Sequence, residues 1–199
     1  MLRWIFAASL ATASFAVAPS HALDWDWTAK DPTEVRRSVQ SRMYRSDKSP
    51  IQRETVRYDG GHPAGTIIVN TSERRLYYTL GDGRAIKYGV GVGKEGFTWA
   101  GANRITRKAE WPGWTPPPQM IRREAAKGRK LPAHMEGGPD NPLGARALYI
   151  GSTLYRIHGT NQPWTIGEAM SSGCIRMANE DVIHLAEQVG IGTRVVVLR

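Results

Sequence analysis

Cys174 is the residue whose type and setting most directly indicate chemistry. It is the only cysteine in the 199 residues, and it follows Ser171-Ser172-Gly173, a flexible turn. Backbone N–H groups in such a turn point outward and stabilise a thiolate or an oxyanion, and Arg176 adds positive charge two residues later. The alternative is an inert buried thiol, since free cysteine is among the most buried residue types. The position favours a reactive nucleophile.

His158 is the best-placed base for this thiol. It ends an apolar run and precedes Gly159, and a single loop separates it from Cys174. A histidine and a cysteine that border the same loop fit a general base and its nucleophile. The imidazole would take the thiol proton, or hold it permanently as an ion pair, and would later protonate a leaving amine. We rank the remaining histidines lower: His21, His62, His134 and His184.

Other kinds of chemistry lack their motifs. A single cysteine excludes an intrachain disulfide and any site built from several thiolates. The sequence contains no His-x-x-His or Cys-x-x-Cys spacing, so we expect no metal. It also contains no Gly-x-Ser-x-Gly elbow and no phosphate-binding P-loop. We therefore expect neither a metal nor a cofactor.

Two polar residues after Cys174 each allow two interpretations. Arg176 would either form an ion pair with a core carboxylate or bind a substrate carboxylate through two parallel hydrogen bonds from its guanidinium. Its position two residues after the nucleophile favours the substrate. Asn179 would either cap a helix or contact substrate, and the Glu180-Asp181 pair behind it favours the cap, because the helix dipole favours acids in the first turn.

The elements that must position these residues are mostly strands. The apolar and β-branched runs predict strands at 66–70, 75–80, 85–92, 147–150, 154–157 and 195–198. The first three form a meander, the next two form a pair that ends at His158, and the last is expected to be central and buried on both faces. One helix is predicted from Asn179 until Gly190 stops it. The predicted fold class is mainly β.

Residues 93–147 are rich in Gly, Pro and Trp and predict a long irregular segment. Long loops inside a compact domain are usually functional or disordered, and three tryptophans argue against disorder. We expect a lid or a groove wall, in which 120–127 forms one or two helical turns.

The N-terminus predicts export. Residues 1–22 combine a positive start, an uncharged run and small residues before a cleavage site after Ala22, which is the layout of a secretory signal peptide. A membrane anchor is disfavoured because spanning a bilayer takes about 20 apolar residues. Residues 23–62 read as an extension or linker, with a short helix allowed at 34–44, and residues 63–199 as the catalytic domain.

The basic composition limits the partners. The chain has 27 Lys and Arg against 18 Asp and Glu, a formal net charge of +9, which becomes +8 when the signal peptide takes Arg3 with it. A basic exported protein meets nucleic acid, acidic lipid or an anionic wall polymer. Export argues against nucleic acid, and the basic residues of 36–57 alternate with acids in a way typical of a solvated segment.

The motifs resemble the YkuD-type L,D-transpeptidase family, exported cysteine enzymes of bacterial cell-wall synthesis. The resemblance covers residues 63–199. It rests on His158-Gly159-Thr160-Asn161, Ile166-Gly167, Ser172-Gly173-Cys174-Ile175-Arg176-Met177, Asn179, Asp181 and upstream segments such as Tyr88-Gly89-Val90-Gly91-Val92-Gly93 and Asn141-Pro142-Leu143-Gly144. It implies a mainly β domain of curved, packed mixed sheets with one short helix after the active-site loop.

The resemblance also implies a set of site residues. Cys174 would be the nucleophile, His158 the base, the Gly159 backbone carbonyl the group that orients the histidine, and the amides of Gly173 and Cys174 the oxyanion donors. The implied substrate-binding residues are Arg176, Ser172, Thr160, Asn161 and Trp111. Many relatives have Ser-His-Gly-Cys where this chain has Ser171-Ser172-Gly173-Cys174, so one histidine must serve both steps here.

The implied reaction is acyl transfer from a peptidoglycan stem tetrapeptide. The thiolate attacks the L,D peptide bond, D-alanine leaves, and an amine takes the acyl group from the thioester. That amine would belong to another stem, a D-amino acid or a protein, and carbapenems would acylate the same thiol. The alternatives are an L,D-carboxypeptidase or endopeptidase on the same scaffold and a non-catalytic wall-binding module. The oligomeric state is left open.

Overall fold

The computed structural model describes residues 48–94 and 99–199. Its strands are β1 (Glu54–Arg57), β2 (Ile67–Asn70), β3 (Arg75–Thr79), β4 (Arg84–Gly89), β5 (Val92–Gly93), β6 (Gly101–Glu110), β7 (Arg146–Ile150), β8 (Arg156–His158), β9 (Ala169–Ser171), β10 (Ile175–Arg176) and β11 (Arg194–Leu198). Its helices are α2 (Pro118–Ala125), α3 (Asn179–Gln188) and a 3-10 turn, η1 (Pro163–Thr165).

Nine of these strands form one sheet in the order β1-β4-β3-β2-β11-β6-β7-β8-β10, and β5 pairs with β9 in a second sheet. The predicted meander is present as β2, β3 and β4, joined antiparallel. The run predicted as one strand at 85–92 ends at Gly89, and only its last residue, Val92, belongs to β5. The mainly β fold class is confirmed, with mixed pairing, since β11 runs parallel to β2 and antiparallel to β6.

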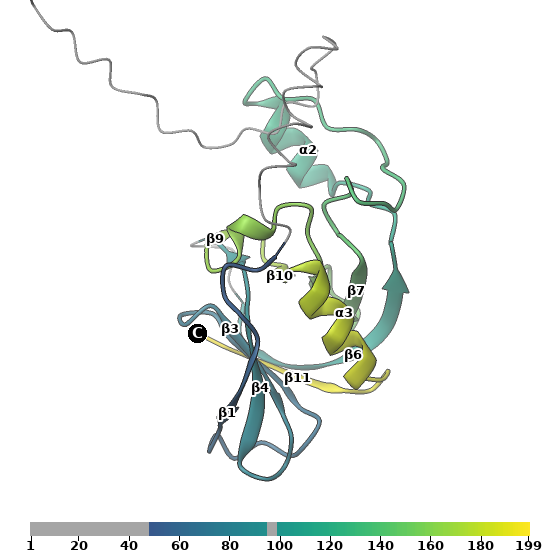
Figure 1. The fold of residues 1–199 in the computed structure, drawn as a ribbon. Coiled ribbons are helices and arrows are strands. Elements are labelled where there is room, and N and C mark those ends of the chain that lie inside the picture. Colours follow the sequence, from purple (N-terminus) through teal and green to yellow (C-terminus); the bar gives the residue numbers. More distant parts are fainter. Residues whose placement is uncertain (1–47, 95–98) are drawn as a thin grey trace, which may run out of the picture.

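β6 connects the two halves of the large sheet. Its first residues pair with β11 and its later residues pair with β7, with a register shift between Ile105 and Arg107. Such an irregularity bends a strand, and Figure 1 shows β6 curving around α3. The prediction of an irregular segment over 93–147 is wrong here. Ile105 is the one buried residue of β6, so the strand carries no apolar alternation and is held by backbone pairing on both sides.

The core lies between the curved sheet and α3. Alternate residues of a strand share a face, so Ile67 and Val69 of β2 point inward together and are fully buried. β11 contributes Val195 and Val197 to the same cluster, and its predicted central position is confirmed. Fully burying each aliphatic side chain contributes about 1.5–3 kcal/mol, so these alternating runs secure the register of the sheet.

The described part of the chain has two α-helices, where the sequence predicted one together with a few helical turns at 120–127. α3 packs against β7 and β8 through Val182, Leu185 and Ala186. α2 spans eight residues, which agrees with the helical turns expected at 120–127, and it lies at the end of the molecule away from β1 (Figure 1). The predicted cap of α3 is wrong, because Ala178 occupies the N-cap and Asn179 is the first helical residue.

The segment before the predicted catalytic domain is part of the sheet where the structure describes it. β1 pairs antiparallel with β4, and Ile51 lies against Gly89 and Gly167. The predicted signal peptide and the helix allowed at 34–44 lie outside the described residues. Within the described residues, no helix is long and apolar enough to cross a membrane.

Candidate active site

The site is built on two neighbouring parallel strands, β8 and β10. Arg176 lies opposite His158 in their register, and continuing the pairing by one residue before Ile175 places Cys174 opposite Arg156. Residues two apart on a strand share a face, so these four side chains point to the same side. All four line one cleft of about 380 Å³. The pairing thus brings together the predicted nucleophile and the predicted base.

β10 is fixed from both sides. Met177 N–H donates to the His158 carbonyl at 2.8 Å on the β8 side. On the other side Arg176 and Gly91 exchange two backbone hydrogen bonds of 2.8 and 2.9 Å. The segment that carries Cys174 is therefore held to His158 by backbone geometry, which is the rigid support that a nucleophile and base require.

The His158 ring is oriented by its own neighbour. Nδ1 lies 2.6 Å from the Gly159 carbonyl oxygen, and the side chain is buried. A carbonyl only accepts hydrogen bonds, so Nδ1 carries the proton and Nε2 carries the free lone pair. Burial, reinforced by the charge of Arg176, lowers the pKa of His158 to about 3, against the raising effect of the Gly159 bond. The imidazole is neutral and ready to accept a proton at Nε2.

The Cys174 thiol is half-buried beside the Leu154 carbonyl oxygen, which lies 3.7 Å from Sγ, within the range of a weak S–H···O bond. Burial raises the pKa of the Cys174 thiol, and the charges of Arg156 and Arg176 offset this only in part. Of the two protonation states considered from the sequence, the raised pKa of Cys174 and the lowered pKa of His158 both favour a neutral thiol and a neutral imidazole. The proton then moves when the thiol attacks.

Ser171 organises the turn before Cys174. Its hydroxyl donates to the Cys174 carbonyl at 2.6 Å and accepts the Gly173 N–H at 3.1 Å. Gly173 has a φ of 110°, a conformation that other residues rarely adopt. The predicted oxyanion donor, the Gly173 amide, is thus engaged by Ser171 and would have to release or share this bond to bind an oxyanion.

The predicted substrate-binding residues separate into two groups. Thr160, Asn161, Ser172 and Arg176 line the cleft. Trp111 does not: it directly follows β6 with a φ of 39°, its N–H donates to the Ala145 carbonyl, and it is 44% exposed. The tryptophan of the cleft is Trp114.

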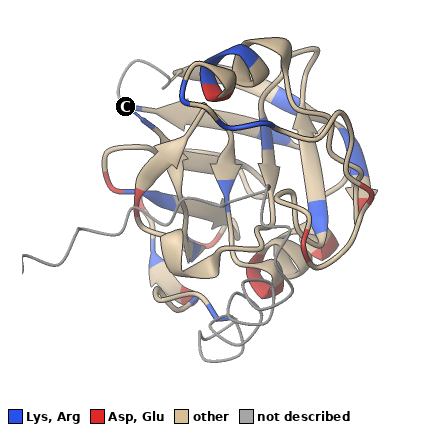
Figure 2. Ribbon diagram, turned by 90° about the horizontal axis from the view of Figure 1, so that it is seen from above, with Lys and Arg blue, Asp and Glu red and all other residues tan. Residues whose placement is uncertain are grey.

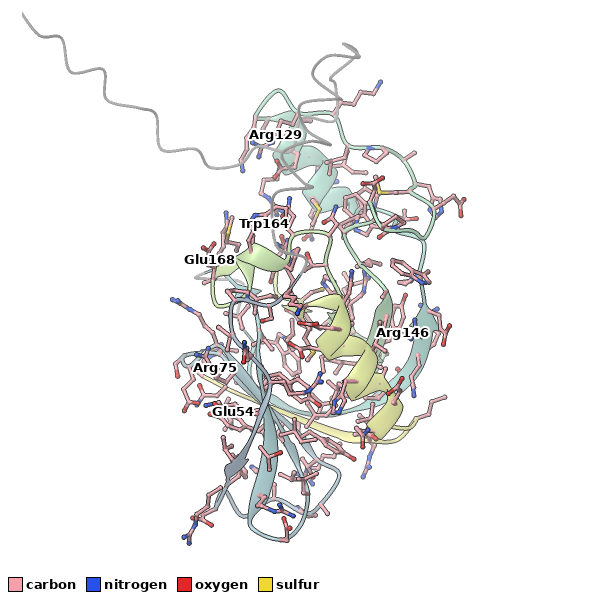
Figure 3. The ribbon with its side chains drawn as sticks, viewed as in Figure 1. Glu54, Arg75, Arg129, Arg146, Trp164 and Glu168 are labelled. Atoms are coloured by element: carbon pink, nitrogen blue, oxygen red, sulfur yellow. The ribbon has the colours of Figure 1, made fainter. Side chains whose placement is uncertain are left out.

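Among the charged residues of the cleft, sequence reasoning missed two, Arg123 and Arg156. Arg123 comes from α2, and its Nη2 donates to Ser172 Oγ at 2.9 Å, across the cleft from β8. Figure 3 shows Arg129 beyond the end of α2, and Trp164 and Glu168 on the segment between β8 and β9. Arg156 had a signal in the sequence, because it lies two residues before His158 in a predicted strand.

Asn179 does not cap α3, as the sequence predicted, but links two loops through its side chain. Its Oδ1 accepts the Ala145 N–H at 2.9 Å and the Thr160 N–H at 3.2 Å. Because Thr160 follows Gly159, this bridge holds the carbonyl that orients His158. Within the described residues, no three His, Cys, Asp or Glu side chains are grouped as metal ligands.

Comparison with known proteins defines the class. Residues 64–197 match the model of the YkuD family, described as the L,D-transpeptidase catalytic domain. The chain is 43% identical over 137 residues to the "Probable L,D-transpeptidase ErfK/SrfK" of Escherichia coli, which covers 66% of this chain and 43% of that protein. It is 44% identical over 134 residues to the "Probable L,D-transpeptidase YbiS" of the same organism, with 65% and 43% covered. The chain belongs to the L,D-transpeptidase catalytic-domain family.

Solved structures show the same fold. An L,D-transpeptidase from Mycobacterium smegmatis superposes with a TM-score of 0.53 at 14% identity, covering 67% of this chain and 58% of that one. L,D-transpeptidase 3 from Mycobacterium tuberculosis gives 0.52 at 16% identity, with 67% and 60% covered. The chain spans less than half the length of the two E. coli relatives, so the correspondence concerns their catalytic domain.

Proposed function

We propose that this protein is an exported L,D-transpeptidase that acts on peptidoglycan stem peptides. The observation that carries the proposal is that the only cysteine shares one cleft with a histidine whose tautomer is fixed by the Gly159 carbonyl, in a member of this family. Cys174 is the nucleophile and His158 the base. Signal-peptide cleavage after Ala22 and a catalytic domain over 63–199 belong to the same proposal.

The first half-reaction forms a thioester. His158 Nε2 takes the thiol proton as Sγ attacks the carbonyl that links the third stem residue to the terminal D-alanine. The tetrahedral intermediate collapses with cleavage of its C–N bond, and the leaving amine takes the proton from Nε2. D-alanine departs, and the stem remains attached to Cys174 through its acyl carbon.

The second half-reaction releases the thiol. An acceptor amine loses a proton to His158 Nε2 and attacks the thioester carbonyl, a new amide bond forms, and the sulfur leaves with that proton. One histidine serves both steps because both move a proton between Nε2 and the atom that joins or leaves the acyl carbon. The acceptor is a stem peptide, a D-amino acid or an envelope protein, and water as acceptor would make the same site a carboxypeptidase.

Two experiments test the proposal. Incubation of the purified protein with a tetrapeptide muropeptide should release D-alanine and produce crosslinked dimers. Tripeptide alone would indicate hydrolysis, and unchanged muropeptide would indicate a binding module. Intact-mass spectrometry with a carbapenem should show one acyl adduct on the wild type and none on Cys174→Ala. An adduct on both proteins would place the reactive group elsewhere.

A further inference from the structure

Two arginines flank the Cys174–His158 pair. Arg156 lies opposite Cys174, and Arg176 lies opposite His158, on the same face of β8 and β10. In the part of the chain that the structure describes, neither arginine has a carboxylate within ion-pair distance, and the residues that line the cleft include no Asp or Glu. Basic residues elsewhere are scattered over the ribbon beside acidic ones (Figure 2). The cleft is thus a local concentration of unneutralised positive charge.

Internal contacts do not account for Arg156. Its Nε is buried and has no hydrogen-bond partner within residues 48–94 and 99–199. The Cζ atom of Arg156 lies 5.4 Å from the centroid of the Tyr149 ring. The guanidinium of Arg107 lies closer to the same ring, with its Cζ atom 3.5 Å from the centroid. Arg156 as a whole is only partly buried and lines the cleft, so a ligand there can reach its guanidinium and supply the opposite charge that the protein does not provide. A guanidinium presents a planar fork of N–H groups that matches a carboxylate, so the missing ligand group is an anion of that shape.

The order of the four side chains assigns one carboxylate to each arginine. His158 protonates the leaving amine, so the amino acid that departs lies on the His158 side, next to Arg176. The acyl group stays on the sulfur, so the residue that carries it lies on the Cys174 side, next to Arg156. We infer that Arg156 binds a carboxylate on the side chain of the residue that becomes attached to Cys174, while Arg176 binds the carboxylate of the amino acid that leaves.

The inference, which rests on the proposed function, defines a substrate class. The acyl donor carries two carboxylates, one at its C-terminus and one on the side chain of its acyl-donating residue. A donor whose side-chain carboxylate is converted to a carboxamide lacks the charge that Arg156 binds. Arg156 is therefore a specificity-determining residue that distinguishes acidic from amidated stems.

The test compares two tetrapeptides that differ only in this group, a carboxylate or a carboxamide on the side chain of the third residue. D-alanine release gives kcat/KM for each donor, and the readout is the ratio of the two values. A variant that loses activity equally with both donors leaves this ratio unchanged. The wild type should prefer the acidic donor by about tenfold or more, as expected when a charged hydrogen bond is lost. Arg156→Gln should bring the ratio to about one, and Arg156→Lys, which keeps the charge without the fork, should give an intermediate ratio.

Arg107→Gln is the matched control, because it removes an equal charge from the same Tyr149 ring without altering the cleft lining. It should keep the wild-type ratio. Equal rates with both donors in the wild type, or a wild-type ratio in both Arg156 variants, would overturn the inference and leave the proposed function intact. Failure of the wild type to release D-alanine from either donor would overturn the proposed function and this inference with it.

Discussion

Asn179 Oδ1 accepts the backbone N–H of Thr160 at 3.2 Å, which joins the first residue of α3 to the residue that follows Gly159. The same oxygen accepts the Ala145 N–H at 2.9 Å. One side-chain atom therefore ties together the helix after the nucleophile, the loop after the base and the start of the β7 region. The orientation of His158 depends on this junction, because the Gly159 carbonyl is the acceptor for its Nδ1 proton.

Asn179→Ala should weaken both stability and catalysis. The substitution leaves two partly buried N–H groups without their acceptor, and each such loss costs about 1–3 kcal/mol. Chemical denaturation should show this decrease in the free energy of unfolding, and D-alanine release should fall further than stability explains because the loop that positions His158 loosens. Asn179→Asp, which keeps an acceptor oxygen at the same place, is the control. Equal losses in the two variants would contradict the bridging role.

Gly144 provides a second test of the same junction. Its φ is 62°, and an added Cβ would lie 2.2 Å from Asn179 Oδ1 and 2.4 Å from Thr160 N. Gly128 has a φ of 74° but nothing within 4 Å of its added Cβ. Gly128→Ala should therefore cost only the left-handed strain of about 1–2 kcal/mol. Gly144→Ala should cost clearly more and reduce activity, as thermal unfolding and D-alanine release will show. Similar costs at both positions would argue against close packing around Asn179.

Features set by the local sequence pattern were predictable, and features set by distant partners were not. β2 and β11 were predictable because their β-branched runs are buried. The shared position of Cys174 and His158 in one cleft was predictable because a lone cysteine and a histidine border the same loop. β6 was missed because it is stabilised by partners far away in the sequence and not by its own side chains. Asn179 was assigned to the wrong role for a related reason. Its partners, Ala145 and Thr160, reach it only after the chain folds, and a local capping preference gave no sign of them.

Asp181 gives a pH dependence to stability. It is buried in the first turn of α3, where Arg53 Nη1 donates to Oδ1 at 3.0 Å, and its Oδ2 has no hydrogen-bond partner among the described residues. Burial raises the pKa of Asp181 to about 6, although Arg53 opposes the shift. Because this value lies above the unfolded value of 3.8, the protonated form favours the folded state. The stabilisation of the folded state by protonated Asp181 is fully present below about pH 4, and it is lost as the pH rises through about 6.

The size of the effect follows from the shift. At about 1.4 kcal/mol per pKa unit, Asp181 should remove at most about 3 kcal/mol of stability between pH 4 and 7. Urea denaturation across this range should show the decline in the wild type and its loss in Asp181→Asn. Asp82→Asn, which alters an exposed carboxyl paired with Arg84, should keep the decline. If Asp181→Asn retains the wild-type slope, the buried carboxyl is not its origin.

The thiol itself can be examined without a peptide substrate. Burial raises the pKa of Cys174 above the 9.0 of an unperturbed thiol, so alkylation by neutral iodoacetamide should be slow at pH 7 and should rise with a midpoint above pH 9. Arg156→Gln and Arg176→Gln each remove a charge that lowers this pKa, so both should move the midpoint higher, with the larger change for Arg156. Arg107→Gln, outside the cleft, should leave it in place. The lowered pKa of His158, about 3, predicts no inflection near pH 6.5. A plateau of full reactivity reached by pH 6 would instead reveal a thiolate–imidazolium pair already formed in the resting enzyme.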